Sequence, residues 1–194
     1  MGIAIFFGLK LSRRLNLPVF TQIETPVQKK FKSFILLTVP TGIITAIIIT
    51  LGDKFFGYYL PQFILVNSHI AIWKTLLAAL YGGIVEEILM RLFCLSLFAW
   101  IIAKISNSVE PAKNNTIMWS AIVLSSILFG LGHLPITAAL TVITPLVVAR
   151  AIVLNGIGGI VFGWLYWKKG LEYAMTTHFT TDIVLLAILP AILK

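Results

Sequence analysis

The stretch Tyr81-Gly82-Gly83-Ile84-Val85-Glu86-Glu87-Ile88-Leu89-Met90-Arg91 places two adjacent carboxylates and an arginine inside an apolar run. This run extends over about residues 75–103, which is long enough to cross a bilayer as one helix. A charged side chain at the bilayer centre costs about 2.5–3.5 kcal/mol on insertion scales. The three charges therefore need either partners or a function.

The order of these charges predicts one ion pair and one carboxylate that still needs a partner. On a helix, Glu87 and Arg91 stand at i and i+4, so they share a face and can pair. Glu86 is rotated by roughly 100° from Glu87 and points elsewhere. Gly82 and Gly83, one turn earlier, leave room for another helix or a substrate to approach. A buried ion pair that locks helix packing would explain Glu87 and Arg91, but it leaves Glu86 unexplained.

The composition is that of a membrane protein. Of the 194 residues, 59% are hydrophobic and 11% are charged, whereas a soluble domain carries about 25% charged residues. The mean hydropathy is +0.99. We therefore expect an all-α, polytopic bundle of about five to seven membrane helices with a polar site in its interior. The net charge of +8 is not a nucleic-acid footprint, because the basic residues flank apolar spans.

The apolar runs predict the membrane spans of a single domain that covers residues 1–194. The expected spans are 33–51, 75–103, a helix that begins near Thr116, 151–167 and 171–193. The pattern leaves open whether 136–149 is a re-entrant piece or a kinked continuation. We expect His133 near the middle of its helix, and Gly156, Gly159 and Gly163 on a face that packs tightly.

The uneven distribution of lysine and arginine between the loops predicts how the chain is oriented in the membrane. Residues 1–32 form an N-terminal cytoplasmic or interfacial segment, because six basic residues oppose one acid between positions 10 and 32 and two prolines break regular structure. The 104–115 loop and Lys168-Lys169 then fall on the same side. Residues 52–74 carry an aromatic belt and suit the opposite face of the membrane, where a short interfacial helix would fit and His69 would be solvated. Arg150 falls on the same face.

Few ionisable residues lie within the expected spans, and intramembrane ionisable residues are functional by default. They are Glu86, Glu87, Arg91, His133, His178 and Asp182. A lone histidine such as His133 is more often a satisfied hydrogen-bonding group than a catalyst. His178 and Asp182 stand at i and i+4, so the carboxylate can accept from one imidazole nitrogen and fix the tautomer; a structural polar contact is an equal alternative.

Taken together, these side chains predict chemistry. A carboxylate and two histidines on three helices form a set that can activate water. The same set could hold a divalent metal with an open coordination position. No HExxH motif occurs, so the common helical zinc-protease site is not predicted.

Three motifs in chain order resemble a known family. They are Glu86-Glu87-x-x-x-Arg91, Phe129-x-x-x-His133 and His178-x-x-x-Asp182. Together they resemble the signature of the CAAX prenyl protease and bacteriocin-processing family, also called CPBP or Abi. The stretch 159–170 is similar to the segment that precedes the family's last motif. The resemblance covers about residues 75–190, which is the expected catalytic core.

The resemblance implies an intramembrane endopeptidase of the cell membrane. By it, Glu86 and His133 activate water, and His178 and Asp182 steady the oxyanion. Its substrate would be a hydrophobic or lipidated peptide or protein at the membrane lipid. Two mechanisms stay open: a zinc or other divalent metal held by Glu86, His133 and His178, or a metal-free reaction of glutamate and histidine.

The remaining motif residues have supporting roles under the same resemblance. Glu87 is counted with the catalytic residues, although together with Arg91 it would support the site structurally. Phe129 shares a helix face with His133 and packs beside it. The sequence departs from the family pattern at Asp182, where many members have asparagine, and at Leu92, where glycine is common. An ionised Asp182 is a poor oxyanion donor, which favours a role as a metal ligand or in orienting His178.

Two other functions fit the same residues. The first is a non-catalytic bacteriocin self-immunity or partner-binding membrane protein on this scaffold. The second is a small transporter or proton relay, since acidic residues and histidines in spans also mark such pathways. The absence of an inverted repeat in the sequence weakens the second.

Overall fold

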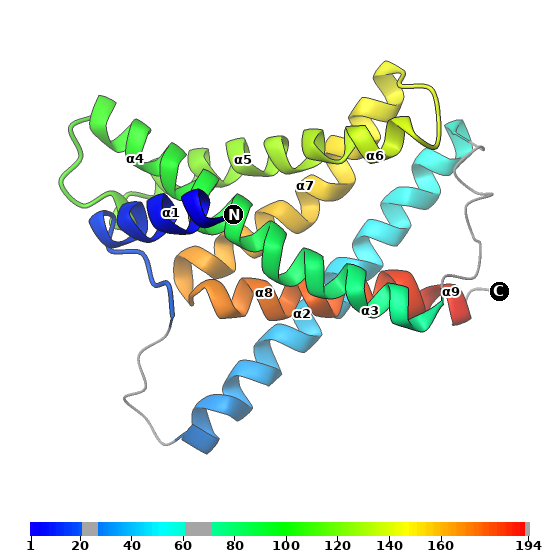
Figure 1. Cartoon of the computed structure of the whole chain (residues 1–194), viewed down its shortest axis with the longest axis horizontal. Helices are drawn as coiled ribbons and strands as arrows, with labels where there is room; N and C mark the ends of the chain where they lie inside the picture. The colour runs from blue at the N-terminus through cyan, green and yellow to red at the C-terminus, as the bar shows by residue number, and fades with distance from the viewer. Residues whose placement is uncertain (21–26, 61–70, 193–194) are drawn as a thin grey trace.

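The computed structural model of the chain describes residues 1–20, 27–60 and 71–192, and within them it is all-helical, with no strand (Figure 1). Five helical segments of this described part are long and apolar enough to cross a membrane. They are Phe31–Tyr59, Ile72–Ile105, Asn115–Ala138, Pro145–Lys168 and Leu171–Ile192. The predicted fold class, a polytopic bundle of membrane helices, is therefore confirmed.

The helices follow one another in a simple order. The first is α1, Gly2–Arg14, and the second is α2, Val27–Tyr59. The Ile72–Ile105 segment is built from α3 (Ile72–Leu80), the π-helical η2 (Tyr81–Glu86) and η3 (Ile88–Leu95), and α4 (Ser96–Ile105). After a short 3-10 turn, η4 (Pro111–Lys113), come α5 (Asn115–Gly132), α6 (Leu134–Ala138), α7 (Pro145–Lys168), α8 (Leu171–Ile183), η5 (Val184–Ile188) and α9 (Leu189–Ile192).

The first span is longer than the predicted 33–51. Helix α2 continues to Tyr59, so Asp53 and the aromatic residues after it extend the span and form no separate interfacial helix. Asp53 does not end the helix because its carboxylate is paired: Arg150 of α7 donates to Asp53 Oδ1 from Nε at 2.8 Å and from Nη2 at 2.6 Å. His69 and the rest of 61–70 lie outside the described residues.

Of the region 136–149, only residues 136–138 continue the preceding span, as part of α6 after the break at His133. Helix α6 ends at Ala138, and α7 begins at Pro145, where a proline is preorganised for the first helical position. The Thr144 hydroxyl caps α7 by accepting from the Val147 amide at 3.3 Å. Arg150 therefore lies inside α7, and the predicted start of this span at residue 151 was too late.

The prediction that His133 lies near mid-helix was wrong. His133 caps the carboxyl end of α5, and its amide donates to the Gly130 carbonyl at 3.2 Å. Helix α6 then continues the span from Leu134, with Pro135 in its first turn. A proline lacks an amide hydrogen and clashes with the carbonyl four residues earlier, so the α-helix breaks before it.

Two clusters of buried apolar side chains hold the bundle together. The larger one joins α4, α5, α7 and α8 through residues such as Ala99, Met118 and Leu171, and it includes Leu15, just after α1. The N-terminal helix is thus packed against the bundle, beside α4 (Figure 1). The smaller cluster joins α2 to α7 through Phe56 and Leu154 and their neighbours.

The outer surface remains apolar. Helix α2, which crosses the bundle diagonally in Figure 1, exposes many large aliphatic side chains. They include Leu36, Ile43, Ile44, Ile47 and Ile48. A continuous apolar exterior of this kind matches a lipid environment. The chain is therefore a multi-pass membrane protein; the cytoplasmic location of its N-terminus stays a prediction.

Two of the three glycines on the predicted small-residue face of α7 contact α5. A Cβ at Gly159 would lie 2.6 Å from Ser126 Oγ and 3.0 Å from Ser126 Cα, and one at Gly163 would lie 3.2 Å from Ile122 Cγ2. Gly156 has nothing within 4 Å of that position. Helices α5 and α7 therefore pack tightly at Gly159 and Gly163, and not at Gly156.

This difference yields a matched test. Gly159→Ala forces α5 and α7 apart and should destabilise the protein by about 1–3 kcal/mol. Gly156→Ala meets no atom and should leave stability unchanged or raise it by about 0.5–1 kcal/mol, because alanine favours the helix. Thermal unfolding of the detergent-solubilised protein measures both. Equal melting temperatures for the two variants would contradict the packing.

Candidate active site

The Glu-Glu-Arg stretch adopts a rare backbone form. The chain is π-helical over Tyr81–Glu86 and again over Ile88–Leu95, with Glu87 between the two. A π-helical turn is wider than an α-helical turn, and such turns occur mostly at functional sites. The two glutamates nevertheless have different surroundings, as predicted: Glu86 is 23% exposed, whereas Glu87 is fully buried.

Two glycines bring this stretch against α8, as predicted. A Cβ at Gly82 would lie 2.5 Å from Asp182 Oδ2 and 3.1 Å from His178 Nε2. A Cβ at Gly83 would lie 2.9 Å from the Met175 carbonyl oxygen. Only glycine allows this approach, and it is what lets the acidic residues of one span reach the histidine of another.

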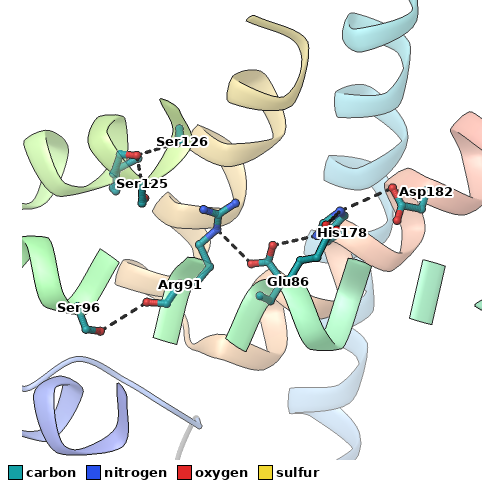
Figure 2. Close-up of polar contacts among 9 residues, drawn as sticks. Glu86, Arg91, Ser96, Ser125, Ser126, His178 and Asp182 are labelled. Carbon is teal, nitrogen blue, oxygen red and sulfur yellow. Dashed lines mark hydrogen bonds and ion pairs between the residues drawn. The ribbon is translucent and has the colours of Figure 1, made fainter. Parts of the chain in front are cut away.

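An ionic chain runs through the buried interior (Figure 2). Arg91 Nε lies 3.2 Å from Glu87 Oε2, and both side chains are fully buried. The other oxygen of this carboxylate, Oε1, lies 2.9 Å from His178 Nδ1. On the far side of the ring, His178 Nε2 lies 3.7 Å from Asp182 Oδ1 and 3.9 Å from Glu86 Oε2. The predicted Glu87–Arg91 pair is confirmed.

The partner of His178 differs from the prediction. Glu87, and not Asp182, makes the hydrogen bond that orients the ring, because its carboxylate reaches Nδ1 at 2.9 Å while Asp182 stays beyond hydrogen-bond distance of Nε2. A carboxylate only accepts, so Nδ1 carries the hydrogen. Nε2 is left facing Asp182 and Glu86. Glu86 thereby gains the partner that the sequence did not supply.

Aromatic rings surround the charged groups. The Arg91 guanidinium lies 5.2 Å from the centre of the Phe129 ring and 5.9 Å from that of Phe162. Phe162 also stacks on His178, with ring centres 4.5 Å apart. None of the three side-chain nitrogens of Arg91 makes a hydrogen bond to the described residues, so its contact with Glu87 is an ion pair. The cation is therefore stabilised by Glu87 and by ring faces, which attract cations electrostatically.

Phe129 also connects the two histidines. Its ring lies edge-on to His133 at 4.8 Å and to His178 at 5.8 Å between centres. His133 Nδ1 lies 2.8 Å from the Phe129 carbonyl oxygen, which only accepts, so this nitrogen also carries its hydrogen. In the neutral ring, Nε2 then holds a lone pair that can accept a proton.

One cavity of about 330 Å³ collects the candidate residues. Its walls include Glu86, His133, His178 and Asp182, which come from three different spans. Glu86 and Asp182 are 23% and 20% exposed, as expected of side chains that face an internal space. Glu87 and Arg91 do not line the cavity. The structure thus separates the cavity residues from the buried pair behind them.

The cavity also contains a residue that the sequence analysis missed. Asn155 of α7 lies on its wall, beside Leu154, Gly158 and Phe162. A side-chain amide in the apolar run of a membrane helix is a signal that could have been read, because polar groups at this depth are costly and tend to be functional. Asparagine does not ionise, so Asn155 is not among the ionisable residues of the spans.

The donor groups do not form a metal site in this arrangement. Within residues 1–20, 27–60 and 71–192, no three histidine, cysteine, aspartate or glutamate side chains converge as metal ligands do. The predicted ligand set of Glu86, His133 and His178 therefore does not fit a resident ion.

Comparison with known proteins identifies the family. The model of the type II CAAX prenyl endopeptidase Rce1-like family matches residues 68–184, which is more than half of the chain. The chain belongs to this family. The matched region contains all three motifs, from Glu86 to Asp182, and confirms the resemblance to CAAX proteases. No curated protein and no solved structure matched the chain. As an Rce1-like family member, the chain is assigned to the membrane proteases of CAAX type.

The buried pair predicts a stability difference. Arg91→Met leaves the Glu87 carboxylate buried without its cation, which should cost about 3–5 kcal/mol. Combining it with Glu87→Gln removes both charges and should recover part of this loss. Glu86→Gln is the matched control on the same segment, because Glu86 faces the cavity and its contact with His178 Nε2 is long, at 3.9 Å. Thermal unfolding in detergent provides the measurement; losses that simply add in the double variant would contradict the coupling.

Proposed function

We propose that this Rce1-like protein is an intramembrane endopeptidase that uses Glu86 and His133 to activate water. The observation that carries the proposal is the shared cavity: a carboxylate and an imidazole from different spans line one half-open cavity within an apolar bundle. Two groups that can accept protons on the walls of one cavity support the assignment of both to the activation of water. The family match supplies the reaction class, the hydrolysis of a peptide bond.

The chemistry requires no group outside the cavity. The ionised Glu86 carboxylate takes a proton from water while the His133 Nε2 lone pair accepts a hydrogen bond from the same molecule and orients it. The water oxygen attacks the carbonyl carbon, and the carbonyl electron pair moves to oxygen. When the intermediate collapses, the carbon–nitrogen bond breaks, and Glu86 returns its proton to the leaving amine. The products are a carboxylate and an amine.

His178 is assigned to the oxyanion. A proton on its Nε2 would be held near Asp182 and Glu86, which lie 3.7 and 3.9 Å away and balance its charge. A donor of this kind stabilises the negative charge that develops on the substrate oxygen. Glu87 fixes the ring from behind at Nδ1, so the direction of Nε2 does not depend on the substrate.

The surroundings of the cavity favour a hydrophobic substrate. Its remaining walls include Ile49, Ala78, Leu154, Leu185 and Leu186. Aliphatic walls around a few polar groups suit a peptide with apolar side chains, and a membrane location suits a substrate held by a lipid group. We therefore propose a lipidated or hydrophobic protein C-terminus as the substrate class.

Substitution of the two residues tests the assignment. Glu86→Gln and His133→Ala should each lower kcat for a quenched fluorescent farnesylated peptide by a factor of about 10²–10⁴, as loss of an acid–base group does. Glu110→Gln is the control, because this glutamate is 62% exposed and pairs only with Lys113 outside the spans. Cleavage that survives in both cavity variants would overturn the proposal. Binding or immunity that survives Glu86→Gln, without any cleavage, would instead favour the non-catalytic function.

Removal of divalent metals tests the reaction type. Because no three donors converge on one point in the described structure, cleavage by the wild-type protein should persist after treatment with a chelator. The rate is measured with the same peptide before and after dialysis against the chelator. A loss of activity that zinc restores would contradict the metal-free reaction and would assign Glu86, His133 and His178 to a metal.

A further inference from the structure

The cavity offers few hydrogen-bond donors to the oxyanion that the proposed reaction would form. The Nδ1–H groups of His133 and His178 are taken by the Phe129 carbonyl and by Glu87. Their Nε2 atoms carry lone pairs in the neutral rings, and an ionised Asp182 only accepts. His178 can therefore donate to substrate only after it gains a proton. A donor that is always protonated must come from elsewhere on the wall.

Asn155 can supply such a donor. Its Nδ2 carries two hydrogens, and one is given to the Ala151 carbonyl oxygen at 2.9 Å. The second hydrogen has no acceptor among the residues that the structure describes, and the side chain lines the same cavity as Glu86. Two hydroxyl groups also line it, but Thr181 already donates to carbonyls of its own helix and of Gly42, and Tyr81 is 55% exposed.

Close packing of α7 on α5 holds Asn155 in place. A Cβ at Gly130 would lie 2.9 Å from the Ala151 carbonyl oxygen, and one at Gly159 would lie 2.6 Å from Ser126 Oγ. Asn155 lies one helical turn from Ala151 and one turn from Gly159, so it stands between two points where the helices touch. A donor on a rigid wall costs no reorganisation when charge develops nearby.

We propose that Asn155 donates its second Nδ2–H to the oxyanion of the tetrahedral intermediate and is thus a catalytic residue. This inference rests on the proposed peptidase function. No bond to Asn155 forms or breaks: the hydrogen bond strengthens as the carbonyl electron pair moves to oxygen, and it weakens when the carbonyl reforms. Asn155 and protonated His178 together provide the oxyanion site that Asp182, as a carboxylate, cannot complete.

Steady-state kinetics of the purified full-length protein in detergent test this role. Asn155→Leu, of similar volume, should lower kcat for the farnesylated peptide by about 10²–10³ with little change in KM, as loss of one oxyanion donor does. An aldehyde analogue of the peptide, whose hydrate resembles the intermediate, should lose affinity by a similar factor. Asn115→Leu, at the exposed start of α5, is the matched control and should leave both values unchanged.

The outcomes separate the two proposals. If the wild type cleaves the peptide and Glu86→Gln abolishes cleavage, but Asn155→Leu keeps kcat within about threefold, the role of Asn155 is overturned and the peptidase stands. Unchanged affinity for the aldehyde also overturns it. If Asn155→Leu fails to fold, Asn155→Ala removes the amide without adding bulk and is held to the same criteria. No cleavage by the wild type overturns the peptidase and the role of Asn155 together.

Discussion

The contact of Glu87 with both Arg91 and His178 is the constraint on which this site depends. One fully buried carboxylate uses one oxygen for the guanidinium and the other for the imidazole, and so ties the second span to the last. A buried charge is tolerated only with its partners, because losing one leaves an uncompensated ion in a low-dielectric interior. The position of His178 in the cavity follows from this contact.

The packing of the bundle serves the same contact. Gly82 and Gly83 remove the side chains that would hold the π-helical segment away from α8. Phe162 stacks on His178, and Phe129 touches both histidines and the Arg91 cation. Charge, ring faces and absent side chains thus act together at one site. The apolar exterior of the spans then keeps this polar interior away from lipid.

The two glutamates, adjacent in sequence, have different environments. Glu87 is fully buried behind His178, whereas Glu86 is 23% exposed and faces the cavity. Two carboxylates that contact opposite nitrogens of one imidazole can divide structural and chemical work between them. This division agrees with the supporting role that the family resemblance implied for Glu87. Helical spacing offered Glu86 no partner, because the group it faces, His178, lies on a different span.

The sequence by itself determined the membrane fold, the five spans to within several residues, the family, and the Glu87–Arg91 pair, because hydropathy and helical spacing are local properties. It did not determine that Glu87 orients His178, that Asp53 pairs with Arg150, or that Asn155 faces the cavity. These contacts join different spans, so they depend on how the helices cross. Helix ends such as that at His133 also escaped prediction, because local breaks compete with a continuous apolar pattern. Only the tertiary structure decided which polar groups share one space.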